Sequence, residues 1–185
     1  MFELISIGPL TFFTMLIVVM VGGFLRGLTG FGSAMLMAGP LAILLEPALA
    51  ITIIVFLEAL ISLPLLRGCY YHVNWPLVRR LLAGAILTAP LGVWTVQILT
   101  QEVAIRVISV LVIISAIAIA FGYQRKSPGS PSKEIAIGSV SGYSCGLAGI
   151  GGPPVVLYLL SGQLKPQEMR ATLIYYFALI DLYVL

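Results

Sequence analysis

The sequence predicts an all-α integral membrane protein. Of its 185 residues, 60% are hydrophobic and 9% are charged, and a chain of this size cannot bury so many apolar side chains inside one water-facing globule. Its apolar residues form runs between short polar stretches, and several runs are long enough to cross a hydrocarbon core about 30 Å thick as helices. The net charge of +3 is too small and too dispersed for nucleic acid to be a partner.

The first apolar run, from Pro9 to Leu45, would be about 55 Å long as a single helix, which is too long for one crossing. Its middle reads GGFLRGLTGFGSAM, Gly22 to Met35, with five glycines and Arg26. We expect a re-entrant hairpin that turns at these glycines, because Ala34 to Leu45 is only about 18 Å long as a helix. Two full crossings are the alternative. Glu3, with no basic region before the apolar run, argues against a cleaved signal peptide.

Three further runs are predicted spans: Ala48 to Leu66, Leu77 to Ile98 and Val103 to Gly122. The segment from Tyr123 to Glu134, YQRKSPGSPSKE, is the most polar in the chain and predicts a flexible linker. We therefore divide the chain into a first transmembrane repeat at 1–122, a cytoplasmic linker at 123–134 and the start of a second, inverted repeat at 135–185.

The repeat shows when the chain is compared with itself at an offset of 119 residues. The first copy's Gly23, Gly27, Leu28, Gly30, Gly32 and Pro47 then match Gly142, Gly146, Leu147, Gly149, Gly151 and Pro166. The second glycine stretch reads SGYSCGLAGIGGPPVVL, Ser141 to Leu157. By the same offset the second copy would extend past Leu185, so we expect a fragment that lacks about two spans. A self-associating chain, and so a homo-oligomer, is the alternative.

The basic residues predict the orientation, because they gather on the cytoplasmic side of short loops. One loop is flanked by Arg67, Arg79 and Arg80. The linker contains Arg125, Lys126 and Lys133. This places both loops in the cytoplasm, and Glu46, Glu102 and the N-terminus outside. The turn of the second copy, with Lys165 and Arg170, prefers the inside, so the copies are predicted to be inverted.

The two glycine stretches predict one shared anion site. Non-helical backbone inside a membrane is tolerated only where protein or a water-filled cavity satisfies its polar groups, and transporters with inverted repeats aim half-helix N-termini at an anionic substrate near the midplane. The predicted substrate-binding residues are Arg26, Gly27, Gly30, Gly32, Ser33, Gly146, Gly149, Gly151 and Gly152. The alternative is that Gly23 and Gly27, like Gly142 and Gly146, are small-residue helix packing contacts.

Arg26 is the one basic residue outside the loops, and a charge at that depth faces a cavity or pairs. It can bind a sulfonate or carboxylate through two N–H groups; pairing with Glu58 and snorkelling are the alternatives. Glu58 is a charge partner, or else a proton carrier that couples ion movement to transport. Cys145 occupies the position of Arg26 in the second copy, as a small buried residue or one that reacts with a sulfur substrate. Asp181 is a weak candidate.

An enzymatic reading has little support. The sequence holds no histidine pair, no serine–histidine pair, no carboxylate cluster and no phosphate loop, and its two cysteines have no metal-ligand spacing. We therefore expect no catalytic residues, no cofactor and no metal site. His72, in a basic loop with aromatic neighbours, is expected at the lipid interface.

The two signatures GFLRGLTGFGSAMLMAGPLAILLEP and GLAGIGGPPVVLYLLSGQLKPQEMRAT resemble the sulfite exporter TauE/SafE family of membrane permeases. The resemblance implies a carrier in the lipid bilayer of the cell inner membrane that moves small sulfur-containing or organic anions, commonly outward. The two glycine breaks add the expected mechanism, which is alternating access with the anion bound at the midplane between them. Members usually have two four-segment halves, whereas this sequence ends earlier. The competing hypothesis is a non-transporting assembly or anchoring subunit in which the glycines only pack helices.

Overall fold

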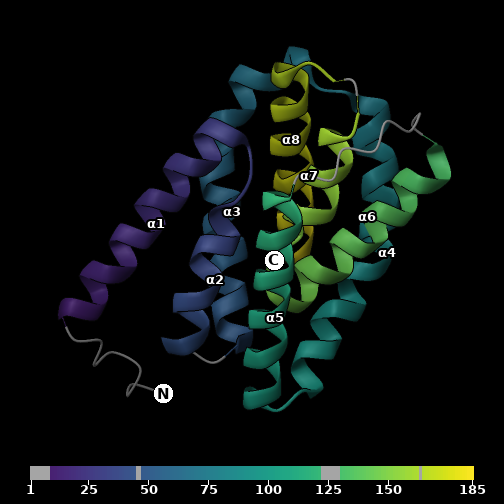
Figure 1. The fold of residues 1–185 in the computed structure, drawn as a ribbon. Helices are drawn as coiled ribbons and strands as arrows, with labels where there is room; N and C mark the ends of the chain where they lie inside the picture. The colour runs from purple at the N-terminus through teal and green to yellow at the C-terminus, as the bar shows by residue number, and fades with distance from the viewer. Residues whose placement is uncertain (1–8, 45–46, 122–129, 163) are drawn as a thin grey trace.

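The computed structural model describes residues 9–44, 47–121, 130–162 and 164–185 (Figure 1). Within these ranges every regular element is helical, which confirms the predicted all-α class. The elements are α1 (Pro9–Thr29), α2 (Ser33–Leu44), α3 (Pro47–Cys69), the 3-10 turn η2 (Tyr70–His72), α4 (Trp75–Ile98), α5 (Gln101–Ala120), α6 (Pro131–Ala148), α7 (Gly152–Leu160) and α8 (Pro166–Val184).

Among the described residues, three helical segments are long and apolar enough to cross a membrane: Ala48–His72, Trp75–Ile98 and Gln101–Ala120. They coincide with the three spans predicted after the glycine stretch. Large apolar side chains such as Leu87 and Phe24 remain more than 65% exposed on the outside of the bundle, where a bilayer would cover them. The start of α4 is fixed locally, since the Asn74 side chain accepts a hydrogen bond from the Leu77 amide.

Both glycine stretches break their helices, as predicted. The α1 helix ends at Thr29 and α2 begins at Ser33, and Gly30 and Gly32 between them have φ angles of 86° and 96°. The α6 helix ends at Ala148, and Gly149 has a φ of 69°. These φ values lie in the left-handed region that glycine adopts without strain. The helices after the breaks have 12 and 9 residues, too few to span a bilayer.

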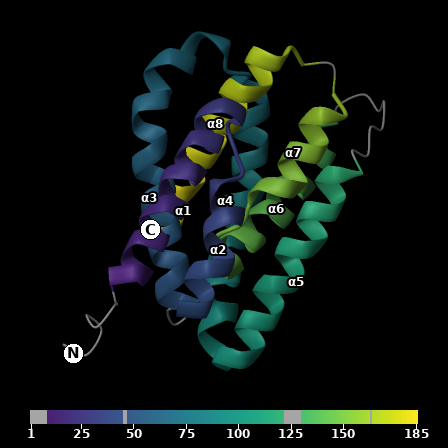
Figure 2. The same ribbon diagram turned by 60° about the vertical axis from the view of Figure 1, so that its left-hand side comes forward.

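The two broken pairs run in opposite directions along the bundle (Figures 1 and 2). Each break also packs into the other half of the chain. Ile150 belongs to the core built mainly by α2 and α3, whereas Phe31 packs against the core built by α4, α7 and α8. These two residues are 119 positions apart. The arrangement supports the inverted repeat, which stays a prediction.

The closest helix pair is α4 with α6, whose backbones touch through small residues. A Cβ atom added at Gly138 would overlap the carbonyl of Leu81, and one at Gly142 would overlap that of Ala85. A Cβ atom added at Gly146 would overlap the carbonyl of Ala89. Gly142 and Gly146 therefore act as small-residue packing contacts between helices, the alternative given above. Gly149 differs, because its positive φ marks a turn.

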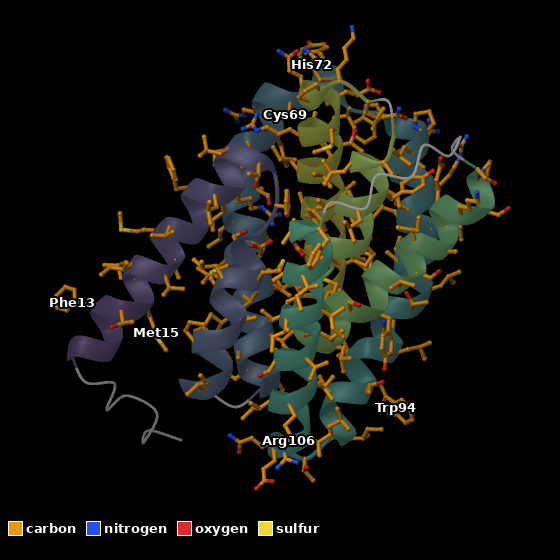
Figure 3. All side chains as sticks on the ribbon, viewed as in Figure 1. Phe13, Met15, Cys69, His72, Trp94 and Arg106 are labelled. Carbon is orange, nitrogen blue, oxygen red and sulfur yellow. The ribbon has the colours of Figure 1, made fainter. Side chains whose placement is uncertain are left out.

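The bundle has two distinct ends. Figure 3 places His72 at one end and Arg106 at the opposite end, in agreement with the predicted separation of the basic loop from the α4–α5 turn. Which end faces the cytoplasm stays a prediction. Residues 122–129 and Glu46 lie outside the described residues, as does Glu3, and α6 begins at Pro131, inside the segment predicted as linker.

Candidate functional site

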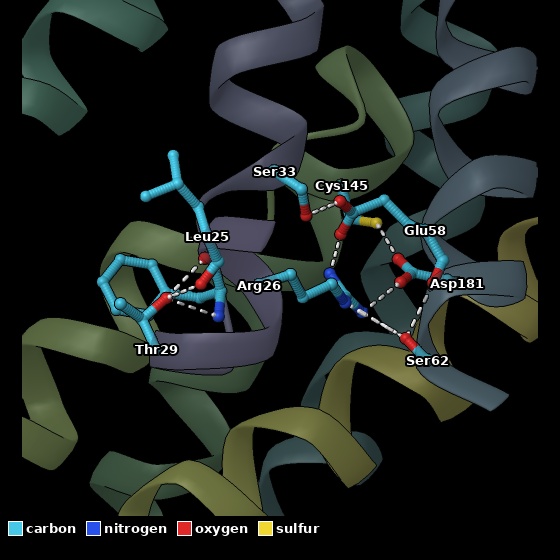
Figure 4. A network of polar contacts seen from close by, with 9 residues as sticks. Leu25, Arg26, Thr29, Ser33, Glu58, Ser62, Cys145 and Asp181 are labelled. Atoms are coloured by element: carbon cyan, nitrogen blue, oxygen red, sulfur yellow. Dashed lines mark hydrogen bonds and ion pairs between the residues drawn. The ribbon is translucent and has the colours of Figure 1, made fainter. Parts of the chain in front are cut away.

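A buried charge network lies at the centre of the bundle, around Arg26 of α1 (Figure 4). The Arg26 side chain is 1% exposed. Its Nη1 donates to a Glu58 carboxylate oxygen of α3, and its Nη2 donates to Oδ2 of Asp181 in α8 at 3.2 Å. The Ser62 hydroxyl accepts from Arg26 Nε at 3.1 Å and from Nη2 at 2.7 Å. Arg26 is thus paired with Glu58, one of the expected alternatives, and does not snorkel.

The two carboxylates of the network are bound unequally. Glu58 uses both oxygens, one for Arg26 and one for the Ser33 hydroxyl at the start of α2. Asp181 has the single contact to Arg26 through Oδ2, while its Oδ1 faces the Cys145 thiol with a sulfur–oxygen distance of 3.8 Å. A thiol is a weak donor, so Asp181 is held less firmly than Glu58.

The network opens on a pocket formed by both glycine breaks. Its lining includes Arg26, Glu58 and Asp181 beside residues of the two breaks: Phe31, Gly32, Gly149, Ile150, Gly151 and Gly152. Phe177 closes one wall, with its ring centroid 5.7 Å from Arg26 Cζ, within the range of a cation–π contact. The free volume of the pocket is about 20 Å³, room for one water molecule.

The structure brings together most of the predicted site residues. Those that line the pocket are Arg26, Gly32, Glu58, Gly149, Gly151 and Gly152, and Ser33 lies directly behind, bonded to Glu58. Three do not line it. The Gly27 carbonyl accepts hydrogen bonds from Arg170, Gly30 packs against the Arg170 backbone, and Gly146 packs against α4.

Two functional candidates, Ser62 and Phe177, escaped the sequence analysis, and Asp181 was only a weak candidate. The repeat offset was the signal that could have found them. Ser62 and Asp181 are equivalent positions, as are Glu58 and Phe177, and as are Arg26 and Cys145. All six lie in the one network around Arg26. The offset of 119 residues therefore pairs each of these six residues with another residue of the same network.

Arg170 of α8 fixes the end of α1 beside this network. Its Nε donates to the Gly27 carbonyl at 3.0 Å, and its Nη2 donates to the same oxygen. A carbonyl in the last turn of a helix has no intrahelical partner and favours a cation.

We expect Arg170→Met to lower stability in detergent by about 1–3 kcal/mol, because the Gly27 carbonyl loses a charged donor. A fall in the thermal unfolding midpoint measures this, with the exposed Arg79→Met as the matched control. Equal midpoints for the two variants would show that the contact contributes nothing.

The comparisons with known proteins agree with this arrangement. No curated protein and no solved structure matches the chain. The sequence profile described as Sulfite exporter TauE/SafE matches residues 15–185, which include both glycine breaks and every residue of the network. That family consists of multi-pass membrane proteins that transport sulfite and related anions. The chain belongs to the sulfite exporter TauE/SafE family.

Proposed function

We propose that this chain moves a small sulfur-containing or organic anion across the membrane by alternating access, and that the anion binds Arg26 in the pocket between the two breaks. The observation that carries the proposal is a fully buried guanidinium on a pocket lined by both breaks. A buried arginine inside a membrane protein is costly and marks a functional pathway. Its planar fork suits a sulfonate or sulfite oxygen pair.

The half-helices add to the attraction for an anion. Both α2 and α7 begin at the pocket, at Ser33 and Gly152. The first turn of a helix carries amide groups without intrahelical partners and the positive end of the helix dipole. Two such ends, together with Arg26, concentrate positive potential on one small volume, as in transporters with broken helices.

Transport requires this pocket to change shape. About 20 Å³ is too little for a polyatomic anion, so we propose that the pocket widens when the anion enters. The small residues that join α4 to α6 favour movement of these two helices as one body, because their backbones are in contact. We propose that α1 and α2 move relative to this body and open the pocket to one side and then to the other.

Gly152 offers a direct test of the pocket. A Cβ atom added there meets only the Phe177 ring, at 3.7 Å, and Gly152 has no positive φ. The backbone at Gly152 therefore accepts a side chain, and leucine, which is larger than the free volume of about 20 Å³, would occupy the space that the anion needs. We expect Gly152→Leu to lower the uptake of labelled sulfite into proteoliposomes at least about tenfold, as the loss of about 1.4 kcal/mol of binding would.

The matched control is Gly68→Leu, at an exposed position where an added Cβ meets nothing within 4 Å. It should transport sulfite as the wild type does. In parallel, sulfite and small sulfonates should raise the unfolding temperature of the wild type but not of Gly152→Leu. Equal uptake by both variants would overturn the assignment of the pocket. Absence of binding and uptake in the wild type would favour the assembly-subunit hypothesis.

A further inference from the structure

The number of donors on Arg26 limits how an anion can bind. A guanidinium has five N–H groups, and four of those on Arg26 are engaged, one by Glu58, two by Ser62 and one by Asp181. An anion that takes a two-pronged contact must displace one of these partners. The Asp181 contact is the weaker of the two ion pairs, because among the described residues only Oδ2 reaches Arg26, at 3.2 Å, and Oδ1 has only a thiol partner.

Binding of the anion in place of Asp181 also creates a charge problem. With one guanidinium and two carboxylates, the buried network has a net charge of −1. A monovalent anion would change the net charge of the network to −2 in a pocket with room for about one water. Uncompensated buried charge is strongly unfavourable. One proton on Asp181 restores the net charge of −1 and leaves a neutral carboxylic acid in place of an unpaired carboxylate.

We propose that Asp181 takes up one proton when the anion binds Arg26, so that one monovalent anion and one proton cross the membrane together. The proposal rests on the proposed function. The proton comes from water on the side to which the pocket is open and bonds to a carboxylate oxygen of Asp181, while Arg26 Nη2 transfers its hydrogen bond from Asp181 to the anion. On the other side the anion leaves, the proton returns to water and Arg26 pairs with Asp181 again.

The surroundings of Asp181 favour it over the other ionisable groups. The titratable groups that face it are Arg26 of α1 and Cys145 of α6, together with Tyr176 on its own helix, and Glu58 of α3 shares Arg26 with it. Glu58 has a polar donor on each oxygen and holds the start of α2 through Ser33. It is therefore bound more firmly than Asp181 and keeps its charge opposite Arg26.

A carrier of this kind has a distinctive energetic signature. The empty and the loaded pocket have the same net charge, so the pocket crosses the membrane potential without moving charge. Accumulation of the anion then follows the proton gradient and not the voltage. Asparagine in place of Asp181 changes this, because the anion then moves with no proton and the loaded pocket differs by one charge from the empty pocket.

The test uses the 185-residue chain in proteoliposomes with labelled methanesulfonate, a monovalent sulfonate that does not titrate near neutral pH. In the wild type, a pH gradient of one unit with the outside acidic should give about tenfold accumulation inside, because one proton accompanies each anion. A potassium diffusion potential should leave accumulation unchanged. Asp181→Asn should reverse both responses, so that a potential positive inside drives accumulation and the pH gradient does not.

Two variants control for folding and chemistry. Asp181→Glu keeps a titratable carboxylate and should keep the response to pH. Glu134→Gln removes another buried carboxylate, one that accepts from Arg80 at 2.8 Å away from the pocket, and should also behave as the wild type. The inference is overturned if anion accumulation in the wild type follows the voltage alone, and this result does not depend on whether Asp181→Asn folds. The inference is also overturned if accumulation in Asp181→Asn still responds to the pH gradient.

The two proposals fail in different ways. If the wild type shows no methanesulfonate exchange across the bilayer, the proposed function fails for monovalent sulfonates and this inference fails with it. If exchange is present but independent of the proton gradient, the anion pocket stands and only the role of Asp181 is lost.

Discussion

Arg26→Met is expected to abolish anion transport and to destabilise the protein by about 3–5 kcal/mol, the usual cost of removing one partner from a buried ion pair. Methionine keeps the length and apolar stem of the side chain but leaves Glu58 and Asp181, each less than 5% exposed, without a cation. Thermal unfolding in detergent and sulfite uptake into proteoliposomes measure the two effects separately.

A charge-balanced variant separates stability from function. In Arg26→Met with Glu58→Gln and Asp181→Asn the pocket has no charge, and neutral groups of similar shape replace the ions. Such replacements are often neutral or stabilising, so this variant should regain most of the lost stability while sulfite uptake stays absent. Recovery of uptake would show that Arg26 only balances the two carboxylates and does not contact the anion.

The sequence was enough to predict the helices and both breaks because local physics decides them. Long apolar runs favour helices, and the two glycine stretches permit the turns between them, through interactions within a few residues. The offset of 119 added a long-range expectation, and the structure brings both breaks to one pocket. The orientation of the bundle and the repeat itself stay predictions.

The sequence could not rank the members of the site, because that ranking depends on which way each side chain faces. Gly27 and Gly32 are five positions apart in one motif, yet Gly32 lines the pocket and Gly27 binds Arg170. Asp181 lies near the end of the last apolar run, where its setting depends on helices distant in sequence. Only the packing of α8 against α3 brings it to Arg26.

The contact between α4 and α6 predicts the other large effect. Gly142→Leu places a Cβ too close to the Ala85 carbonyl, so the two helices must separate at this point. Overpacking usually costs about 1–3 kcal/mol, and here the side chain meets backbone that cannot rotate away. We expect a loss of about 3 kcal/mol or more, measured by thermal unfolding, with Gly142→Ala intermediate and the exposed Gly68→Leu unchanged.

The same substitution tests whether the α4–α6 contact positions the pocket. Gly142 lies two turns before the break at Gly149, and the residues after that break form one wall of the pocket. If α4 holds α6 in place, separation of the two helices displaces this wall from Arg26, and anion binding at low temperature should weaken even in the fraction that stays folded. If binding is unchanged in a destabilised but folded Gly142→Leu, the position of the pocket must instead depend on the packing of the break itself, chiefly of Ile150 in the core that contains Ile51 and Ile54.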